Sequence, residues 1–174
     1  MKTLLLLRHA KSAWSDARLD DHDRPLNGRG ERAAKAMADH IAGNAPRPDL
    51  ILCSTAMRTR QTLAPLLKRL GSPAPPISLE NGLYLASEDV LLAHLQAVGN
   101  DVSTALLIGH NDGIGQLAAA LPGSGPPDAL ARLREKYPTG ALAVLRLPDG
   151  PWRDLGPGSA ELVEFVRPRD LGVT

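Results

Sequence analysis

The sequence contains a single cysteine, few aromatic residues and almost no net charge. Cys53 is the only cysteine in 174 residues, which excludes an intrachain disulfide and a cysteine-based metal cluster. Because it follows a run of aliphatic residues, we predict that its thiol is buried and inert. Aromatic residues make up 3% of the chain and the net charge is +1, so neither a stacking platform nor a basic stripe for nucleic acid is expected.

Long apolar segments are also missing from the sequence. No stretch approaches the roughly 20 apolar residues that a membrane-spanning helix needs. The four leucines at positions 4–7 are interrupted by Arg8 before they reach the roughly 7–15 apolar residues of a signal peptide. We therefore expect a cytoplasmic protein without a membrane partner. A Gly-Lys-Ser/Thr phosphate loop is absent too, which excludes nucleotide hydrolysis by that mechanism.

Three short apolar runs are each followed by cationic or imidazole side chains. The run at 4–7 leads into Arg8 and His9, the run at 50–53 is followed by Arg58, and the run at 105–108 leads into His110. Such runs are typical of buried parallel strands, whose carboxyl ends form the ligand-binding edge of an open sheet. The edge would gather guanidinium groups that match phosphate oxygens and imidazoles that can attack phosphorus.

The remaining pattern alternates between strands and helices. We predict strands near residues 3–8, 50–53, 77–79, 105–108, 141–147 and 161–166. Helices are predicted near residues 29–42, 54–70, 87–98, 111–121 and 129–136, with N-caps at Asn27, at Ser54 or Thr55, and at Ser87. Residues 122–128 are rich in glycine and proline and are expected to form an exposed loop. The sequence thus predicts one domain over residues 1–174, a three-layer α/β/α sandwich with a mainly parallel sheet and antiparallel strands late in the chain.

Four separated motifs carry a resemblance to a known family. They are RHAKS at 8–12, DRPLNGRG at 23–30, STAMRTRQT at 54–62 and GHN at 109–111. In order and spacing they resemble the histidine phosphatase superfamily, which includes the cofactor-dependent phosphoglycerate mutases, and within it the small phosphohistidine phosphatase-like branch. The resemblance spans nearly the whole chain.

The resemblance implies catalytic roles for four residues. His9 would be the nucleophile that takes the phosphoryl group and forms a phosphohistidine intermediate. Arg8, Arg58 and His110 would supply the positive charge that the phosphoryl transition state needs, so no metal or other cofactor is expected. The two arginines should also disfavour protonation of His9, which keeps its lone pair available.

Neighbouring residues are candidates for contacts to the substrate. Ser12 and Asn111 could donate to the phosphate, although Asn111 could equally cap a helix. Arg24 resembles an arginine that borders the pocket in the phosphohistidine-specific branch, and a surface position is equally compatible with the sequence. Trp14 would either line the pocket or anchor its loop. His22 lacks a partner motif and is interpreted as a surface or helix residue.

The general acid is not identified by the sequence. Relatives that cleave phosphomonoesters carry a glutamate after the third strand or an aspartate directly after the second histidine, whereas Asn111 follows His110 here. Asp21, Asp23 and Glu80 are the candidates. A poorly placed acid suits a P–N bond, because a protonated phosphoimidazole leaves without further help.

We therefore predict a metal-independent phosphatase that acts on phosphohistidine, in a protein or in a small substrate. Phosphate and related oxyanions should bind in its pocket. Two alternatives remain open at this point: a phosphomonoesterase for sugar or nucleotide phosphates, and a phosphate-binding relative without catalysis.

Overall fold

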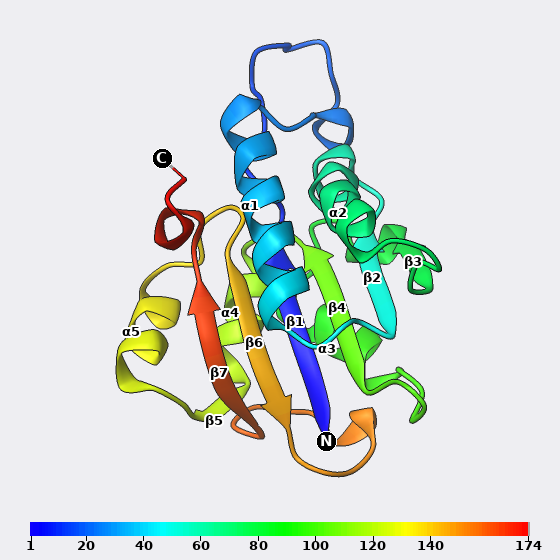
Figure 1. The fold of residues 1–174 in the computed structure, drawn as a ribbon, viewed down its shortest axis with the longest axis vertical. Helices are drawn as coiled ribbons and strands as arrows, with labels where there is room; N and C mark the ends of the chain where they lie inside the picture. Colours follow the sequence, from blue (N-terminus) through cyan, green and yellow to red (C-terminus); the bar gives the residue numbers. More distant parts are fainter. Residues whose placement is uncertain (174) are drawn as a thin grey trace.

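A central sheet of seven strands organises the fold (Figure 1). The computed structural model describes residues 1–173. The strands are β1 (Lys2–Arg8), β2 (Leu50–Ser54), β3 (Ile77–Glu80), β4 (Thr104–Gly109), β5 (Pro122–Ser124), β6 (Leu142–Leu147) and β7 (Ala160–Val166). Their order across the sheet is β3-β2-β4-β1-β6-β7-β5. β1, β2, β3 and β4 pair in parallel, whereas β6 is antiparallel to β1 and β7. The predicted α/β fold with antiparallel strands late in the chain is confirmed.

Helices cover both faces of the sheet and make three layers (Figure 1). One face carries α1 (Gly28–Asn44) and α2 (Met57–Leu70), and the other carries α3 (Glu88–Gln96), α4 (Gly113–Ala120) and α5 (Pro127–Glu135). Side chains alternate along a strand, so the leucine run of β1 packs on both layers. Leu5 and Leu7 contact the α1–α2 side, whereas Leu4 and Leu6 contact the opposite side. None of the helices in residues 1–173 is long and apolar enough to cross a membrane.

The helix starts agree with the sequence prediction at two caps and differ at a third. Asn27 accepts a hydrogen bond from the Gly30 amide, and Ser87 accepts one from the Val90 amide. The prediction that Ser54 or Thr55 caps α2 is wrong, because α2 begins at Met57 after Ala56 and has no side-chain cap. The Ser54 hydroxyl lies instead 2.8 Å from Nε2 of His110.

The segment predicted as a loop at residues 122–128 contains regular structure. Pro122–Ser124 form β5, which pairs in parallel with β7 at the edge of the sheet, and α5 begins at Pro127. The strand was not predicted because the segment is rich in glycine and proline and because its pairing partner lies almost 40 residues later in the chain.

The parallel register brings the predicted functional residues to one edge of the sheet. Arg8 at the end of β1 pairs with Gly109 at the end of β4, and Cys53 in β2 pairs with Ile108 in β4. His9, Ser54 and His110 therefore follow or end neighbouring strands at the same edge. Cys53 itself is fully buried, as predicted, and burial raises the pKa of its thiol to about 12.

Candidate active site

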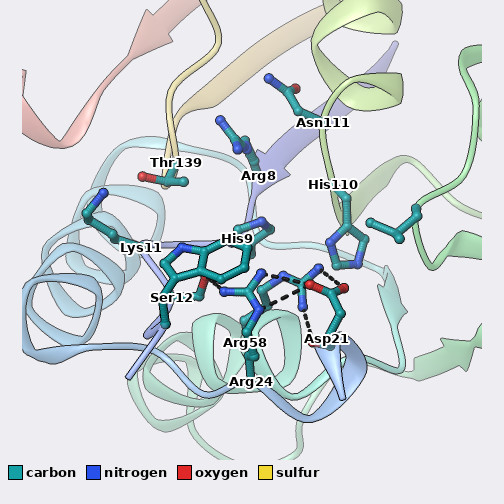
Figure 2. Close-up of a pocket in the computed structure, with 12 residues that line it drawn as sticks. Arg8, His9, Lys11, Ser12, Asp21, Arg24, Arg58, His110, Asn111 and Thr139 are labelled. Carbon is teal, nitrogen blue, oxygen red and sulfur yellow. Dashed lines mark hydrogen bonds and ion pairs between the residues drawn. The ribbon is translucent and has the colours of Figure 1, made fainter. Parts of the chain in front are cut away.

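The carboxyl edge of the parallel strands opens into a cavity of about 380 Å³ (Figure 2). The structure brings together all seven residues that were predicted as catalytic or substrate-binding: Arg8, His9, Ser12, Arg24, Arg58, His110 and Asn111. Of the candidate acids, Asp21 also lines the cavity. The rest of its lining consists of Lys11, Trp14, Leu85 and Thr139.

His9 directly follows β1, and its ring is oriented by a neighbouring backbone group. Nδ1 lies 2.7 Å from the carbonyl oxygen of Ala10. Because a carbonyl only accepts hydrogen bonds, Nδ1 carries the proton and Nε2 carries the lone pair in the neutral ring. Burial, together with the charges of Arg58 and Arg8, lowers the pKa of His9 to about 4, against the opposing effect of the Ala10 hydrogen bond. At neutral pH the imidazole is therefore neutral, with an unprotonated Nε2.

His110 follows β4 and lies beside His9. The two ring centroids are 5.3 Å apart and the planes are inclined at 51°. Burial, followed by the neighbouring His9 and Arg58, lowers the pKa of His110 to about 3. Like His9, it is neutral at pH 7 in this structure. Its contact with Ser54 fixes it to the end of β2.

The two predicted arginines approach the cavity from different elements. Arg8 at the end of β1 donates to the carbonyl oxygen of Tyr137 at 2.9 Å. Arg58 on the first turn of α2 is 2% exposed and donates to the backbone and side chain of Asp21, at 2.7 and 2.9 Å. Charged groups buried to this extent require counter-charges or strong acceptors.

Several buried side-chain nitrogens at this edge have no hydrogen-bond partner. Among residues 1–173, four buried side-chain nitrogens form no hydrogen bond, and three of them are Nε of Arg8, Nε of Arg58 and Nδ1 of His110. Buried polar atoms are rarely left unpaired in proteins. The predicted catalytic set thus contains an unusual concentration of unsatisfied nitrogens around one cavity.

Arg24 belongs to the pocket rather than to the open surface. Its side chain is 8% exposed, and its guanidinium stacks on Trp14 at 3.5 Å from the ring centroid. Nη1 donates to the hydroxyl of Ser12 at 2.5 Å. Trp14 itself is 77% exposed. It lines the cavity, and its ring covers one face of the Arg24 guanidinium.

Asp21 is the carboxylate at the centre of the cationic set (Figure 2). It forms ion pairs with Arg24 and with Arg58, each at 2.9 Å, and accepts a hydrogen bond from the hydroxyl of Tyr84. Burial opposes its ionisation, but the hydrogen bonds from Tyr84, Arg24 and Arg58 outweigh this and hold its pKa well below the usual range. A carboxylate held ionised in this way cannot donate a proton, which argues against Asp21 as the general acid.

The other two candidate acids lie outside the cavity lining. Asp23 is two residues beyond Asp21 in a 3-10 turn (Asp21–Asp23), where side chains two apart point in different directions, and it faces His22 at 3.6 Å. Glu80, at the end of β3, accepts a hydrogen bond from Ser78 at 2.6 Å. The structure therefore does not support either as a proton donor.

Asn111 makes a capping hydrogen bond to α4 from the position before the N-cap residue Asp112. Its Oδ1 accepts from the Gly115 amide in α4 and its Nδ2 donates to the carbonyl oxygen of Tyr137, both at 3.1 Å. The side chain still lines the cavity, but its hydrogen-bonding groups are already committed to the backbone.

Two ring-bearing residues near the site were not among the predicted site residues. Tyr84 contacts Asp21 and packs edge-on against His110, with centroids 5.4 Å apart. His22, interpreted from the sequence as a surface or helix residue, lies in the 3-10 turn with its side chain 35% exposed. It packs edge-on against Tyr84 and lies 2.8 Å from the hydroxyl of Thr55. No motif marks either residue, because their contacts join loops that are distant in sequence.

The described residues contain no evident metal centre. In residues 1–173 no group of three or more His, Cys, Asp or Glu side chains is arranged to hold a metal ion. Independence from metals remains a prediction to be tested by experiment.

Comparisons with known proteins agree with this arrangement. Residues 4–84 match the sequence model of the histidine phosphatase superfamily (branch 1). The phosphohistidine phosphatase SixA of Escherichia coli K12 is 30% identical over 126 residues, which cover 71% of this chain and 77% of SixA. The chain belongs to the histidine phosphatase superfamily. The family together with its SixA-like relatives identifies it as a phosphatase, an enzyme that removes phosphoryl groups by hydrolysis.

Other relatives extend the similarity of this histidine phosphatase over nearly its full length. An uncharacterized protein of Mycobacterium tuberculosis is 44% identical over 165 residues, covering 94% of this chain and 100% of its own. A solved structure from Nakamurella multipartitia, described as a candidate phosphohistidine phosphatase SixA, has a TM-score of 0.81 and 35% identity, with 96% of each chain covered.

Proposed function

We propose that this histidine phosphatase hydrolyses phosphohistidine through a phosphoryl group carried on His9. The observation that carries the proposal is the orientation of His9, whose Nδ1 donates to Ala10 and whose Nε2 therefore holds the lone pair. The lowered pKa of about 4 keeps that lone pair unprotonated at neutral pH. A nucleophile of this kind, surrounded by Arg8, Arg24 and Arg58, is suited to attack on an anionic phosphoryl group.

The reaction consists of two displacements at phosphorus. In the first, Nε2 of His9 forms a bond to phosphorus as the P–N bond of the substrate breaks, and the departing imidazole keeps the electron pair. If that imidazole already carries a proton on its other nitrogen, it leaves as a neutral group. In the second, a water oxygen attacks phosphorus, the bond to His9 breaks, and inorganic phosphate and a proton are released.

The cationic residues act on the charge of the transferred group. Arg8 and Arg58 carry unpaired Nε atoms, and His110 carries an unpaired Nδ1. A dianion brought into the cavity would offset the charge of the neighbouring arginines and favour protonation of His110, whose pKa is lowered by burial and cationic neighbours. His110 would then donate to the equatorial oxygens of the transition state alongside the two arginines.

The choice of a P–N substrate rests on the state of the pocket carboxylate. Asp21 is held ionised by Arg24, Arg58 and Tyr84, so it cannot protonate the oxygen of a departing alcohol. An alkoxide needs such a proton, whereas a protonated imidazole does not. The similarity to SixA of Escherichia coli, a phosphohistidine phosphatase, supports the same substrate class.

A side-by-side assay tests the proposal. Phosphate release is measured from a phosphohistidine peptide, from phosphoramidate and from a panel of sugar and nucleotide monophosphates. We expect a higher kcat/KM for the phosphohistidine peptide than for any ester. Faster cleavage of a sugar phosphate would replace the proposal with a phosphomonoesterase, and no turnover of any substrate would favour a non-catalytic phosphate-binding protein.

A further inference from the structure

A second cavity of about 460 Å³ lies next to the active site and shares Arg8, Lys11 and Thr139 with it. Figure 2 shows these three residues on the side of the pocket away from Asp21. Six of the chain's 20 Lys and Arg residues line this second cavity, which we call the cationic groove, and no Asp or Glu is among its described lining residues. The six are Arg8, Lys11, Arg29, Lys136, Arg167 and Arg169.

The groove is part of the folded framework rather than a collection of loose side chains. Gly140 has a φ of +77°, and a Cβ added there would lie 2.8 Å from Cγ of Pro168 and 3.8 Å from Cβ of Ala33. This close approach joins the segment before β6, the 3-10 turn after β7 and helix α1. The Gly140 amide also donates to the carbonyl oxygen of His9 at 2.8 Å, so the groove wall is fixed to the backbone of the nucleophile.

The charges of the groove are largely uncompensated within the described chain. Arg167 forms an ion pair with Asp170 at 2.9 Å, whereas Lys11, Arg29, Lys136 and Arg169 form no ion pair with residues 1–173. In a protein whose net charge is only +1, such a concentration of one sign raises the local concentration of anions.

The position of Arg29 adds a second argument. It is the second residue of α1, where the helix dipole disfavours a positive charge and acidic residues are usual. A cation there weakens the helix slightly, so helix stability does not account for its position.

We propose that the cationic groove binds a second anionic group of the substrate, namely an acidic side chain close to the phosphohistidine in the substrate protein. The inference rests on the proposed function, because it assumes that the phosphoryl group entering the pocket is carried by a polypeptide. Arg8 and Lys11 line both cavities, so a chain seated with its phosphoryl group at His9 places neighbouring side chains along the groove. Guanidinium and ammonium groups then form charge-assisted hydrogen bonds with the carboxylate.

The first experiment measures binding without turnover. Isothermal titration calorimetry compares orthophosphate with tripolyphosphate. When one phosphoryl group of tripolyphosphate occupies the pocket, its other two carry negative charge beyond that position. We expect tripolyphosphate to bind the wild type at least about tenfold more tightly. The double variant Arg29→Ala/Arg169→Ala should lose about tenfold in affinity for tripolyphosphate, as expected for two exposed cations.

The control removes the same number of charges elsewhere. Lys68 on α2 and Arg153, between β6 and β7, line neither cavity, so Lys68→Ala/Arg153→Ala should bind tripolyphosphate like the wild type. Equal losses in both double variants would show an effect of net charge alone and would overturn the proposal. Unchanged tripolyphosphate affinity in Arg29→Ala/Arg169→Ala would overturn it as well.

The second experiment asks whether the anion comes from a polypeptide. Two phosphohistidine peptides differ only in having Glu or Gln on both sides of the phosphohistidine. We expect kcat/KM to be several-fold higher for the Glu peptide, with a ratio near one in Arg29→Ala/Arg169→Ala. A ratio near one in the wild type would contradict an acidic peptide as occupant, even if tripolyphosphate binds tightly. If neither peptide is hydrolysed, the calorimetry still reports on the groove, so failure of the two proposals can be told apart.

Discussion

Folding stability should fall steeply as the pH is lowered from 8 to 5, because two buried histidines resist protonation in the folded state. His9 and His110 have folded pKa values of about 4 and about 3, both lowered mainly by burial. In the unfolded chain each should titrate near 6.5. Between these values the unfolded state binds more protons, so the free energy of unfolding decreases as the pH falls.

The size of the effect follows from the two shifts. The stabilisation is fully present above about pH 6.5 and is lost towards the folded pKa values. At pH 5 an unfolded histidine is almost completely protonated, while His9 and His110 remain mostly neutral in the folded protein. Each of the two therefore lowers the free energy of unfolding by about 2 kcal/mol relative to pH 8. This is a large fraction of the stability of a typical domain.

Urea unfolding followed by circular dichroism provides the assay, at pH 8, 7, 6 and 5 with constant ionic strength and no phosphate. The variant His9→Asn should lose about half of the pH dependence, whereas His94→Asn, which removes a histidine outside the pocket, should retain all of it. A free energy of unfolding that is flat between pH 8 and 5 would refute the assignment of both histidines as buried and neutral. An unchanged slope in His9→Asn would refute it for His9.

Three further predictions concern Arg58, Asp21 and the independence of the reaction from metal ions. Arg58→Ala should raise the inhibition constant of vanadate by about 10- to 100-fold, because charge-assisted hydrogen bonds to the oxyanion are lost; the neighbouring Arg60→Ala is the control, and an unchanged constant would remove Arg58 from the site. Asp21→Asn should lower the vanadate inhibition constant by removing a competing anion, while destabilising the fold by about 1 kcal/mol after solvent screening. If Asp21→Asn instead abolished ester hydrolysis and spared phosphohistidine hydrolysis, Asp21 would be the general acid after all. Treatment with EDTA should leave activity intact, and loss of activity that Mg²⁺ or Zn²⁺ restores would disprove metal independence.

The strand framework could be predicted because each strand carries its own signal. The leucine run before Arg8 and the aliphatic run before His110 are apolar on both sides, which marks buried parallel strands. Once those strands lie side by side, the residues that follow them are brought together, and no further contact has to be predicted. This is why Arg8, His9 and His110 were predicted from the local pattern, and why Arg58, at the start of α2, was predicted from the motif around it.

The identity of the central carboxylate could not be predicted in the same way. Asp21 and Asp23 are equivalent in the sequence, and the difference between them arises from contacts of Asp21 with Arg58 and Tyr84, 37 and 63 residues away. The loop that carries them has no periodicity from which its path could be inferred. Similarly, nothing local shows that the Ser54 hydroxyl contacts His110, 56 residues later, instead of capping α2.

The central claim is that phosphoryl transfer passes through His9, and trapping the intermediate tests it most directly. The enzyme is quenched during turnover of a ³²P-labelled phosphohistidine peptide, and the labelled residue is located by peptide mapping. We predict acid-labile, alkali-stable label on His9 in the wild type, no label in His9→Ala, and a loss of turnover by several orders of magnitude in that variant. Label on another residue, or near-normal turnover by a folded His9→Ala, would contradict the mechanism.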